Sequence, residues 1–304
     1  MQYGLKTAIF AGLFAASGCT SALPAAPADA PVAASSSPAA AEPARLGCET
    51  AGPTPESLPG ATPHIYASRP TRDLRLHVFA PANAAPAHPA IVFFFGGGWR
   101  TGSPTIFADR ALRMAKEGYV AIVPDYRVSC RDETTPADSA ADATAAYDWV
   151  RGHADDLNID VSRIVLSGGS AGGHIALTAA LKAAPDQRPA ALVLFNPAVF
   201  VPPRFGLSPQ DMASISPSVL PVDGAPPTIV LHGDADTTVP IQSVRDFCKR
   251  MTSAGRRCEL KEYPGKAHGF FQRREPDPAL GGVSAYDETL GQAIAFLKAQ
   301  GVSD

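Results

Sequence analysis

Apolar runs alternate with segments of helical periodicity from about residue 70 onward. Residues 74–81 (LRLHVFAP) alternate apolar and polar positions, which is typical of a half-exposed strand. Further strands are predicted at 90–98, 119–126, 163–169, 191–197, 227–233 and 258–264. Helices are predicted at 104–117, 136–152, 170–184, 240–254 and 284–300. Strands that are mostly buried and alternate with helices predict an α/β fold, with a mainly parallel central sheet and helices on both faces.

Residues 198–225 interrupt this alternation. The segment is rich in proline and serine and lies between two predicted strands. Long loops in compact domains are usually functional, so we expect a short cap insertion over a site. The alternative is a surface excursion that never meets a substrate.

The first residues predict an export signal. Lys6 provides a short positive region, and residues 7–16 (TAIFAGLFAA) are too few to span a bilayer. Cys19 follows small residues, which resembles a bacterial lipobox with Ala16 where leucine is commoner. We therefore predict a lipoprotein signal peptide at 1–18 and acylation of Cys19. The alternative is a plain signal peptide cleaved elsewhere.

Residues 19–45 are almost entirely Ala, Pro and Ser. They lack the large apolar side chains that offset ordering entropy, which favours a disordered tether. We expect residues 46–304 to form the folded domain. The expected location is outside the cytoplasm, anchored to a membrane through the N-terminal lipid. Thr20 favours the outer membrane or a site facing the periplasm.

Composition limits the partners. The net charge is −3, charged residues make up 18% of the 304 residues, and no run of five basic residues occurs. We therefore expect no nucleic-acid partner.

Four cysteines follow Cys19, and an even number in an exported protein suggests disulfides. Cys248 lies near the end of a predicted helix and Cys258 begins the next strand, so a short turn can bring them together. We favour a Cys248–Cys258 disulfide, which leaves Cys48–Cys130 as the weaker second pair. The alternative is four free, mostly buried thiols.

Ser170 lies where a predicted strand turns directly into a predicted helix. Gly168 and Gly172 flank it in a G-x-S-x-G pattern, the sequence of a nucleophile elbow. Side chains at those two positions would collide with the strand and helix. A phosphate-binding loop is the alternative, but GGSAGGH matches neither glycine-rich phosphate motif. We predict that Ser170 is a nucleophile.

A nucleophilic serine needs a histidine base and an acid, in the chain order Ser, acid, His for this kind of turn. Among seven histidines, only His268 follows every plausible acid loop. His174 and His232 are expected to be structural. Two acids, Asp234 and Asp236, follow the strand at 227–233, and position alone leaves both open.

Four motifs resemble one family. They are FGGGW (95–99), GGSAGG (168–173), HGDADTTVP (232–240) and AHGFF (267–271). In this order, they resemble the α/β-hydrolase esterases, near the hormone-sensitive-lipase-like and bacterial acetyl-xylan or feruloyl esterases. The resemblance covers about residues 70–300 and implies the α/β-hydrolase fold. It also implies that Asp236 is the acid and that Asp234 organises the turn.

The resemblance further implies an oxyanion hole formed by the N–H groups of Gly97, Gly98 and Ala171. Phe95 departs from the family pattern, which has histidine there. Trp99 is either a core residue or a wall of the substrate pocket.

A fifth segment, PDYR (124–127), also matches the family. We interpret Asp125 and Arg127 as a structural ion pair.

These residues predict two-step acyl transfer without metal or organic cofactor. We expect a short-chain carboxylesterase acting on a small ester or an acylated glycan. One alternative is a prolyl-oligopeptidase-like peptidase or a formamidase, although the chain is too short to add a propeller. The other is a non-catalytic binding module.

Overall fold

The described part of the chain contains one eight-stranded sheet. The computed structural model describes Cys48 and residues 51–83 and 85–303. The predicted signal peptide (1–18), Cys19 and the tether (19–45) lie outside these residues. The strand order is β1-β2-β4-β3-β5-β6-β7-β8. In chain order the strands are β1 (Thr62–Ser68), β2 (Asp73–Phe79), β3 (His88–Phe94), β4 (Val120–Pro124), β5 (Ile159–Gly169), β6 (Ala191–Phe195), β7 (Thr228–Gly233) and β8 (Cys258–Tyr263).

The sheet is parallel over most of its width. β1 pairs with β2, and β2 with β4, in antiparallel register. Every other neighbouring pair, from β4 through to β8, is parallel. Strands β3, β4, β6 and β7 are buried at every position, as expected for strands covered on both faces. The predicted α/β class with a mainly parallel sheet is confirmed.

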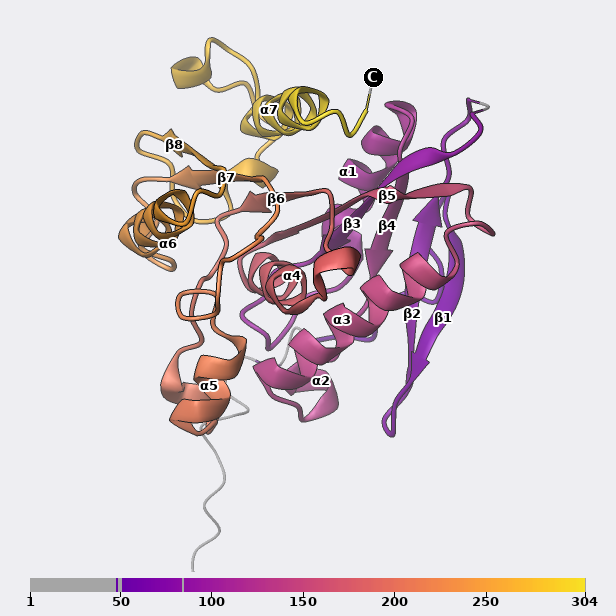
Figure 1. Ribbon diagram of the computed structural model, residues 1–304, viewed down its shortest axis with the longest axis horizontal. Helices are drawn as coiled ribbons and strands as arrows, with labels where there is room; N and C mark the ends of the chain where they lie inside the picture. Colours follow the sequence, from indigo (N-terminus) through magenta and orange to yellow (C-terminus); the bar gives the residue numbers. More distant parts are fainter. Residues whose placement is uncertain (1–47, 49–50, 84, 304) are drawn as a thin grey trace, which may run out of the picture. The chain divides into compact units, whose positions relative to one another are not determined.

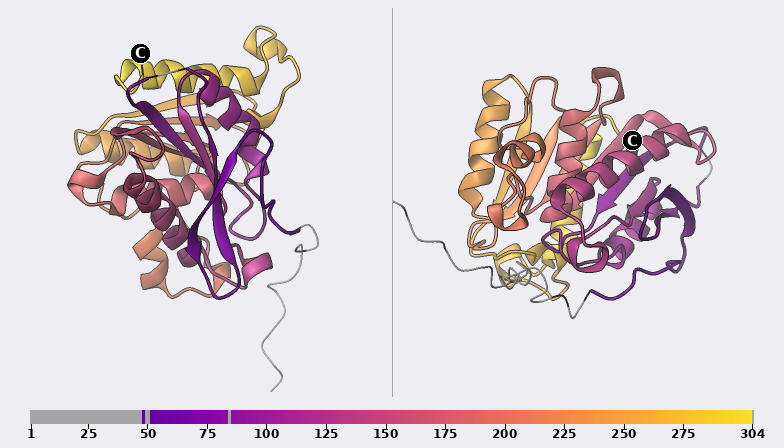
Figure 2. Two further views of the ribbon diagram at one scale, coloured as in Figure 1. Left: turned by 90° about the vertical axis from the view of Figure 1, so that its right-hand side faces the viewer. Right: turned by 90° about the horizontal axis from the view of Figure 1, so that it is seen from below.

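Helices cover both faces of the sheet. α1 and α7 lie on one face, and α3, α4 and α6 lie on the other (Figures 1 and 2). The described helices are α1 (Thr105–Lys116), α2 (Ser129–Asp132), α3 (Pro136–Gly152), α4 (Ala171–Lys182), α5 (Pro209–Ile215), α6 (Ile241–Ser253) and α7 (Ala285–Ala299). None of these helices, within residues 51–83 and 85–303, has the length and apolarity to cross a bilayer.

Local sequence explains where the helices on the α3–α4 face begin. Thr135 and Asp138 form a reciprocal capping box, with Pro136 in the first turn, at the start of α3. α4 buries every residue from Ala171 to Leu181, so it forms the centre of this layer beneath the sheet. The helix that follows Ser170 is therefore held by packing around its whole circumference.

Three elements escaped the sequence analysis. β1 lies in the segment before residue 70, where the proline-rich sequence gave no strand signal, and it is a half-exposed edge strand. α2 is a single turn. α5 lies within the 198–225 insertion, which is thus partly helical rather than wholly irregular.

Both expected disulfides form in the structure. Cys248, in α6, pairs with Cys258 at the start of β8, and Cys48 pairs with Cys130 in α2.

The expected Asp125–Arg127 ion pair is wrong. Asp125 pairs with Arg72 and, at 3.4 Å, with Arg131. Arg127 instead pairs with Asp142 of α3, at 2.7 Å from Nε to Oδ2. Both residues are structural, but each uses a partner that is distant in sequence and that adjacency in the motif could not reveal.

Candidate active site

Ser170 occupies a sharp turn between β5 and α4. Its backbone lies at φ 53° and ψ −120°, a conformation that L-residues rarely adopt. The turn is possible because the neighbouring glycines lack side chains. A Cβ at Gly172 would lie 2.1 Å from the carbonyl oxygen of Phe94, at the end of β3. The geometry therefore has the form expected of a nucleophile elbow.

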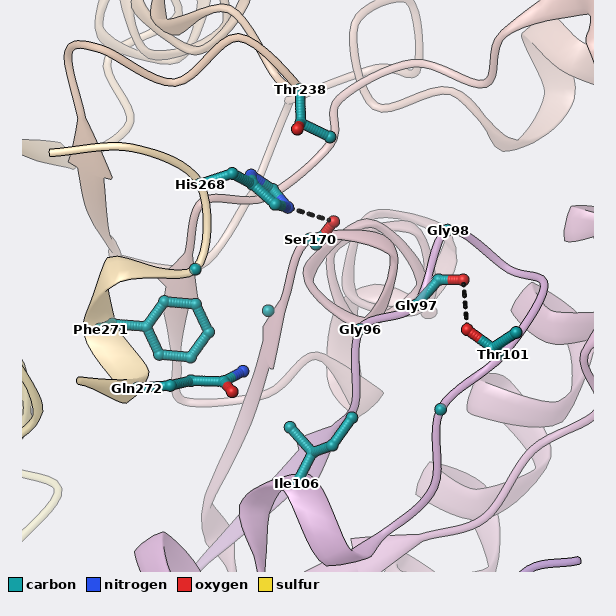
Figure 3. A pocket seen from close by; sticks show the side chains of 13 residues that line it. Gly96, Gly97, Gly98, Thr101, Ile106, Ser170, Thr238, His268, Phe271 and Gln272 are labelled. Carbon is teal, nitrogen blue, oxygen red and sulfur yellow. Dashed lines mark hydrogen bonds between the residues drawn. The ribbon is translucent and has the colours of Figure 1, made fainter. Parts of the chain in front are cut away.

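Three side chains from separate loops meet at this turn. His268 Nε2 lies 2.9 Å from Ser170 Oγ (Figure 3), and His268 Nδ1 lies 2.7 Å from Asp236 Oδ2. Asp236 follows β7 and His268 follows β8, and parallel strands bring these loops to the same edge of the sheet. The sequence-predicted serine, acid and histidine are thus joined in one hydrogen-bonded chain.

Asp236 is buried and surrounded by donors. The N–H groups of Thr238 and Val239 donate to Oδ1 at 2.9 and 2.8 Å, and Asn196 Nδ2 donates to Oδ2 at 3.0 Å. Burial opposes ionisation of this carboxyl. Hydrogen bonds from His232, His268 and Val239 outweigh burial and hold the pKa of Asp236 well below its ordinary value. The carboxylate is therefore charged at neutral pH.

Two neighbours of this carboxylate were missed or underrated by sequence reasoning. His232 Nε2 lies 3.3 Å from Asp236 Oδ2 and 2.9 Å from the carbonyl oxygen of Val239. Asn196 has a positive φ of 44° at the end of β6. A polar residue at the carboxyl end of each of two neighbouring strands, His232 in β7 and Asn196 after β6, was the available signal. Asp234 behaves as expected: it accepts a hydrogen bond from the N–H of Gly265 at 2.6 Å, which joins the acid loop to the histidine loop.

The loop after β3 folds back on itself beside Ser170. The carbonyl oxygen of Gly97 accepts the N–H groups of Arg100 and Thr101 at 3.0 and 3.1 Å. Because a trans peptide points its C=O and following N–H in opposite directions, the N–H of Gly98 points away from that turn. Gly97 has φ 134°, and a Cβ there would lie 2.2 Å from the carbonyl oxygen of Thr101. Ala171 is the first residue of α4, so its N–H has no partner within the helix.

Phe95 braces this loop in place of the histidine of the family pattern. Its ring stacks on Tyr126, with centroids 4.0 Å apart, and Tyr126 Oη donates to the Phe95 carbonyl oxygen at 2.6 Å. Both residues are fully buried. Ring stacking and the Tyr126 hydrogen bond therefore hold the start of this loop.

Trp99 is a core residue. It is 3% exposed, and it is not among the residues that line the cavity at Ser170. Its Nε1 donates to His174 Nδ1 at 3.3 Å. Burial lowers the pKa of His174 to about 3, so this ring is neutral and accepts the bond. Of the two roles considered for Trp99, its burial and its bond to His174 are those of a core residue.

A cavity of about 340 Å³ opens over Ser170 (Figure 3). The glycine loop after β3 (Gly96–Gly98) forms one side, and Phe271, Gln272 and Ile106 form another. No residue of the 198–225 insertion lines this cavity, although Phe205 packs edge-on against Trp99, which follows the glycine loop. The insertion thus contacts the glycine loop through Phe205 and Trp99 but does not line the cavity over Ser170. Within the described residues, no cluster of three His, Cys, Asp or Glu side chains could hold a metal ion.

Family comparisons divide the chain into two matching segments. Residues 76–196 match the BD-FAE family, and residues 206–278 match the prolyl oligopeptidase family. The first segment contains the glycine loop after β3 and Ser170, and the second contains Asp236 and His268.

The relatives with curated names and the similar solved structures given below are all esterases. Esterase LipC of Mycobacterium tuberculosis is 28% identical over 72% of this chain, and the isoprenylcysteine alpha-carbonyl methylesterase ICME of Arabidopsis thaliana is 26% identical over 78%. The chain spans only 64% and 61% of these two proteins. Esterase 2 of Thermogutta terrifontis, phosphoramylated by tabun, superposes with a TM-score of 0.73 and 39% identity, covering 80% of this chain and 96% of that one. The same esterase has been solved with propionate and with butyrate bound. Such identity over nearly the whole length of a solved esterase establishes the family, and the chain belongs to the α/β-hydrolase esterases.

Proposed function

We propose that the protein is a serine carboxylesterase that hydrolyses short-chain esters through Ser170, His268 and Asp236. The observation that carries the proposal is the continuous hydrogen-bonded chain from Ser170 Oγ through the His268 ring to a buried carboxylate. This arrangement lets imidazole take the serine proton while the carboxylate stabilises the imidazolium that forms.

The reaction proceeds in two steps. His268 takes the proton of Ser170, whose oxygen attacks the ester carbonyl, and the alcohol leaves with that proton. Water then attacks the acyl-serine by the same route and releases the acid. The N–H groups of Gly97, Gly98 and Ala171 receive the oxyanion in both steps, and one such donor typically changes the rate by roughly 100- to 1000-fold.

A short acyl group suits the cavity. Its volume is about 340 Å³, near the lower end of ligand pockets, and Gly169 and Phe271 bring a mainly apolar wall close to the nucleophile. The propionate- and butyrate-bound forms of the Thermogutta terrifontis esterase support the same acyl range.

The direct test compares the protein with its Ser170→Ala variant on nitrophenyl esters from acetyl to decanoyl. We expect the highest kcat/KM between acetyl and butyryl. We also expect a loss of roughly 10⁴- to 10⁶-fold in kcat for the variant. A fluorophosphonate probe should label the parent protein and not the variant. Equal turnover by both forms would exclude Ser170 as the nucleophile.

Two finer features extend the proposal. Acetylated polysaccharide is a suitable substrate because the described insertion leaves the nucleophile uncovered. The protein would meet this substrate outside the cytoplasm if Cys19 is acylated and holds it to a membrane. Acetate release from acetylated xylan tests the first feature, and turnover of small esters without any release would reject it. Membrane fractionation of the Cys19→Ala variant tests the second, and retention in the membrane fraction would reject acylation of Cys19.

Amide hydrolysis is the second candidate function. The match of residues 206–278 to the prolyl oligopeptidase family supports it. A proline-containing peptide anilide distinguishes the two functions. We expect its kcat/KM to lie far below that of acetyl esters, and the reverse order would favour a peptidase.

A further inference from the structure

A second cavity adjoins the catalytic one. It measures about 200 Å³ and shares Ile106, Phe271 and Gln272 with the cavity over Ser170. Figure 3 shows these three side chains together, on the side of the catalytic cavity opposite Thr238. The far side of the second cavity is formed by charged and hydroxyl-bearing residues, namely Thr105, Asp109, Arg110, Arg274 and Tyr286. An acyl chain that reaches past the shared wall therefore enters polar surroundings.

Arg110, on α1, places a buried positive charge in this second cavity. The residue is 2% exposed, and its guanidinium lies 4.5 Å from the Phe195 ring centroid and 4.4 Å from that of Tyr286. Its Nη2 donates to the carbonyl oxygen of Phe271 at 2.7 Å. Buried charges in proteins are normally paired with an opposite charge.

Among the described residues, no carboxylate forms an ion pair with Arg110. The two nearby acids are engaged elsewhere: Asp287 pairs with Arg113 at 3.2 Å, and Asp109 pairs with Arg274. Burial lowers the pKa of Arg110 to about 10, a value at which the group still carries its charge at neutral pH. The second cavity thus has one uncompensated cation.

Tyr286 adds an unused hydrogen-bonding group. The residue is 5% exposed, and its hydroxyl has no hydrogen-bond partner among the described residues. A buried hydroxyl without a partner is uncommon and costs free energy. A cation and a free hydroxyl beside one small cavity are the groups that would bind a carboxylate.

We propose that the second cavity is an acyl-end subsite for a carboxylate, and that the enzyme hydrolyses monoesters of short dicarboxylic acids. Arg110 and Tyr286 bind the free carboxylate while the ester carbonyl lies at Ser170. Water cleaves the ester bond, so that a monomethyl ester yields methanol and the dicarboxylic acid. This proposal rests on the proposed esterase function and names its substrate class.

The test is a matched series of methyl esters at pH 7.5. Monomethyl succinate, glutarate and adipate carry the terminal carboxylate at increasing distances. In the corresponding half-amides, the methyl ester is kept and the terminal carboxylate is replaced by a primary carboxamide, which has the same shape without the charge. Methyl pentanoate has neither terminal group. We expect kcat/KM for the best-fitting monoester to exceed that of its half-amide by roughly 10- to 100-fold, the range for a hydrogen bond to a charged group. A ratio of 1 or less throughout the series would overturn the proposal.

Variants assign the preference to the subsite. Arg110→Gln should bring the ratio close to 1, and Tyr286→Phe should lower it by roughly fivefold. Lys116→Gln is the matched control, because Lys116 is an exposed cation on the same helix and does not line the second cavity. Damage to the fold, or to the turn that carries His268, would lower kcat/KM for the monoester and for its half-amide equally, so it would leave their ratio unchanged. If Arg110→Gln lowers both rates equally, Arg110 is only a structural cation and the proposal is wrong.

Two further arms separate the remaining outcomes. Free glutarate that inhibits turnover of methyl pentanoate, without any preference for monoesters, would show a site for free anions and refute the substrate class. Calorimetric binding to Ser170→Ala needs no turnover: monomethyl glutarate should bind more tightly than its half-amide. Loss of all ester hydrolysis by the parent protein, with this binding difference retained, would reject the esterase function and keep the subsite.

Discussion

His174 should make the free energy of unfolding depend on pH at values well above those at which the carboxylates of the protein titrate. The ring lies in the first turn after the nucleophile, is fully buried, and accepts a hydrogen bond from Trp99 Nε1 at 3.3 Å. The informative change is His174→Asn, because the Asn Oδ1 can take the place of Nδ1 as acceptor and does not titrate. The variant keeps the bond to Trp99 and removes only the proton equilibrium.

The sign and size follow from the two pKa values. Burial lowers the folded-state pKa of His174 to about 3, while the unfolded chain has the ordinary value of about 6.5. Below pH 6.5, His174 is therefore protonated in the unfolded state and remains neutral in the folded state. The stability is complete above pH 6.5 and is lost as the pH falls toward 3, at up to about 1.4 kcal/mol per pH unit. Between pH 7.5 and pH 5 the loss amounts to about 2 kcal/mol.

Urea unfolding followed by tryptophan fluorescence at pH 7.5, 6 and 5 measures this loss. The parent protein should lose about 2 kcal/mol more than His174→Asn over the interval. His77 is also buried with a lowered pKa, but it contributes equally to both proteins and cancels. His64→Gln, at a partly exposed ring, serves as the control and should follow the parent. Parallel pH profiles for the parent and His174→Asn would refute the reasoning.

Three other predictions concern stability and the acid loop. In the chain-entropy model, removing the Cys48–Cys130 disulfide, with a sequence separation of 82, should lower the unfolding free energy by about 4.5 kcal/mol. Removing the Cys248–Cys258 disulfide, with a separation of 10, should lower it by about 2.7 kcal/mol. Denaturant titrations of the two Cys→Ser double variants should give losses in that order, and the reverse order would contradict the model. Arg72→Met leaves two buried carboxylates without their main partner and should lower the unfolding free energy by about 3–5 kcal/mol, measured the same way; a change below about 1 kcal/mol would show that other donors suffice. Asn196→Ala removes one donor from Asp236, so kcat on acetyl esters should fall by roughly tenfold with KM little changed, while a change in KM alone would argue for a role in binding.

The chemistry of the site was accessible from sequence because each reacting residue sits in a short motif with a local steric reason. Ser170 needs its glycine neighbours, and the 2.1 Å approach of a Gly172 Cβ to the Phe94 carbonyl shows why. His268 follows from chain order, because the last loop of a parallel sheet returns to the same edge as the others. Choosing Asp236 over Asp234 needed the family pattern, since both follow β7.

The sequence by itself also determined the α/β class and most of the strands and helices that build it, and it favoured the disulfide pairs that the structure contains. Continuous apolar strands require cover on both faces, and helical periodicity between them supplies it. β1 escaped because it is a half-exposed edge strand with little burial to impose a pattern.

Only the tertiary structure decided which side chains meet across the sheet. Several of these contacts join residues from separate elements. They are the ion pairs of Asp125 and Arg127, the bond from Trp99 to His174, and the hydrogen bond from Asn196 to Asp236. The cavity beside Arg110 likewise needs α1, α7 and the His268 loop to converge. Such contacts arise because the chain crosses the sheet before it returns. The residues that meet are separated by up to 184 positions, and no local pattern records their approach.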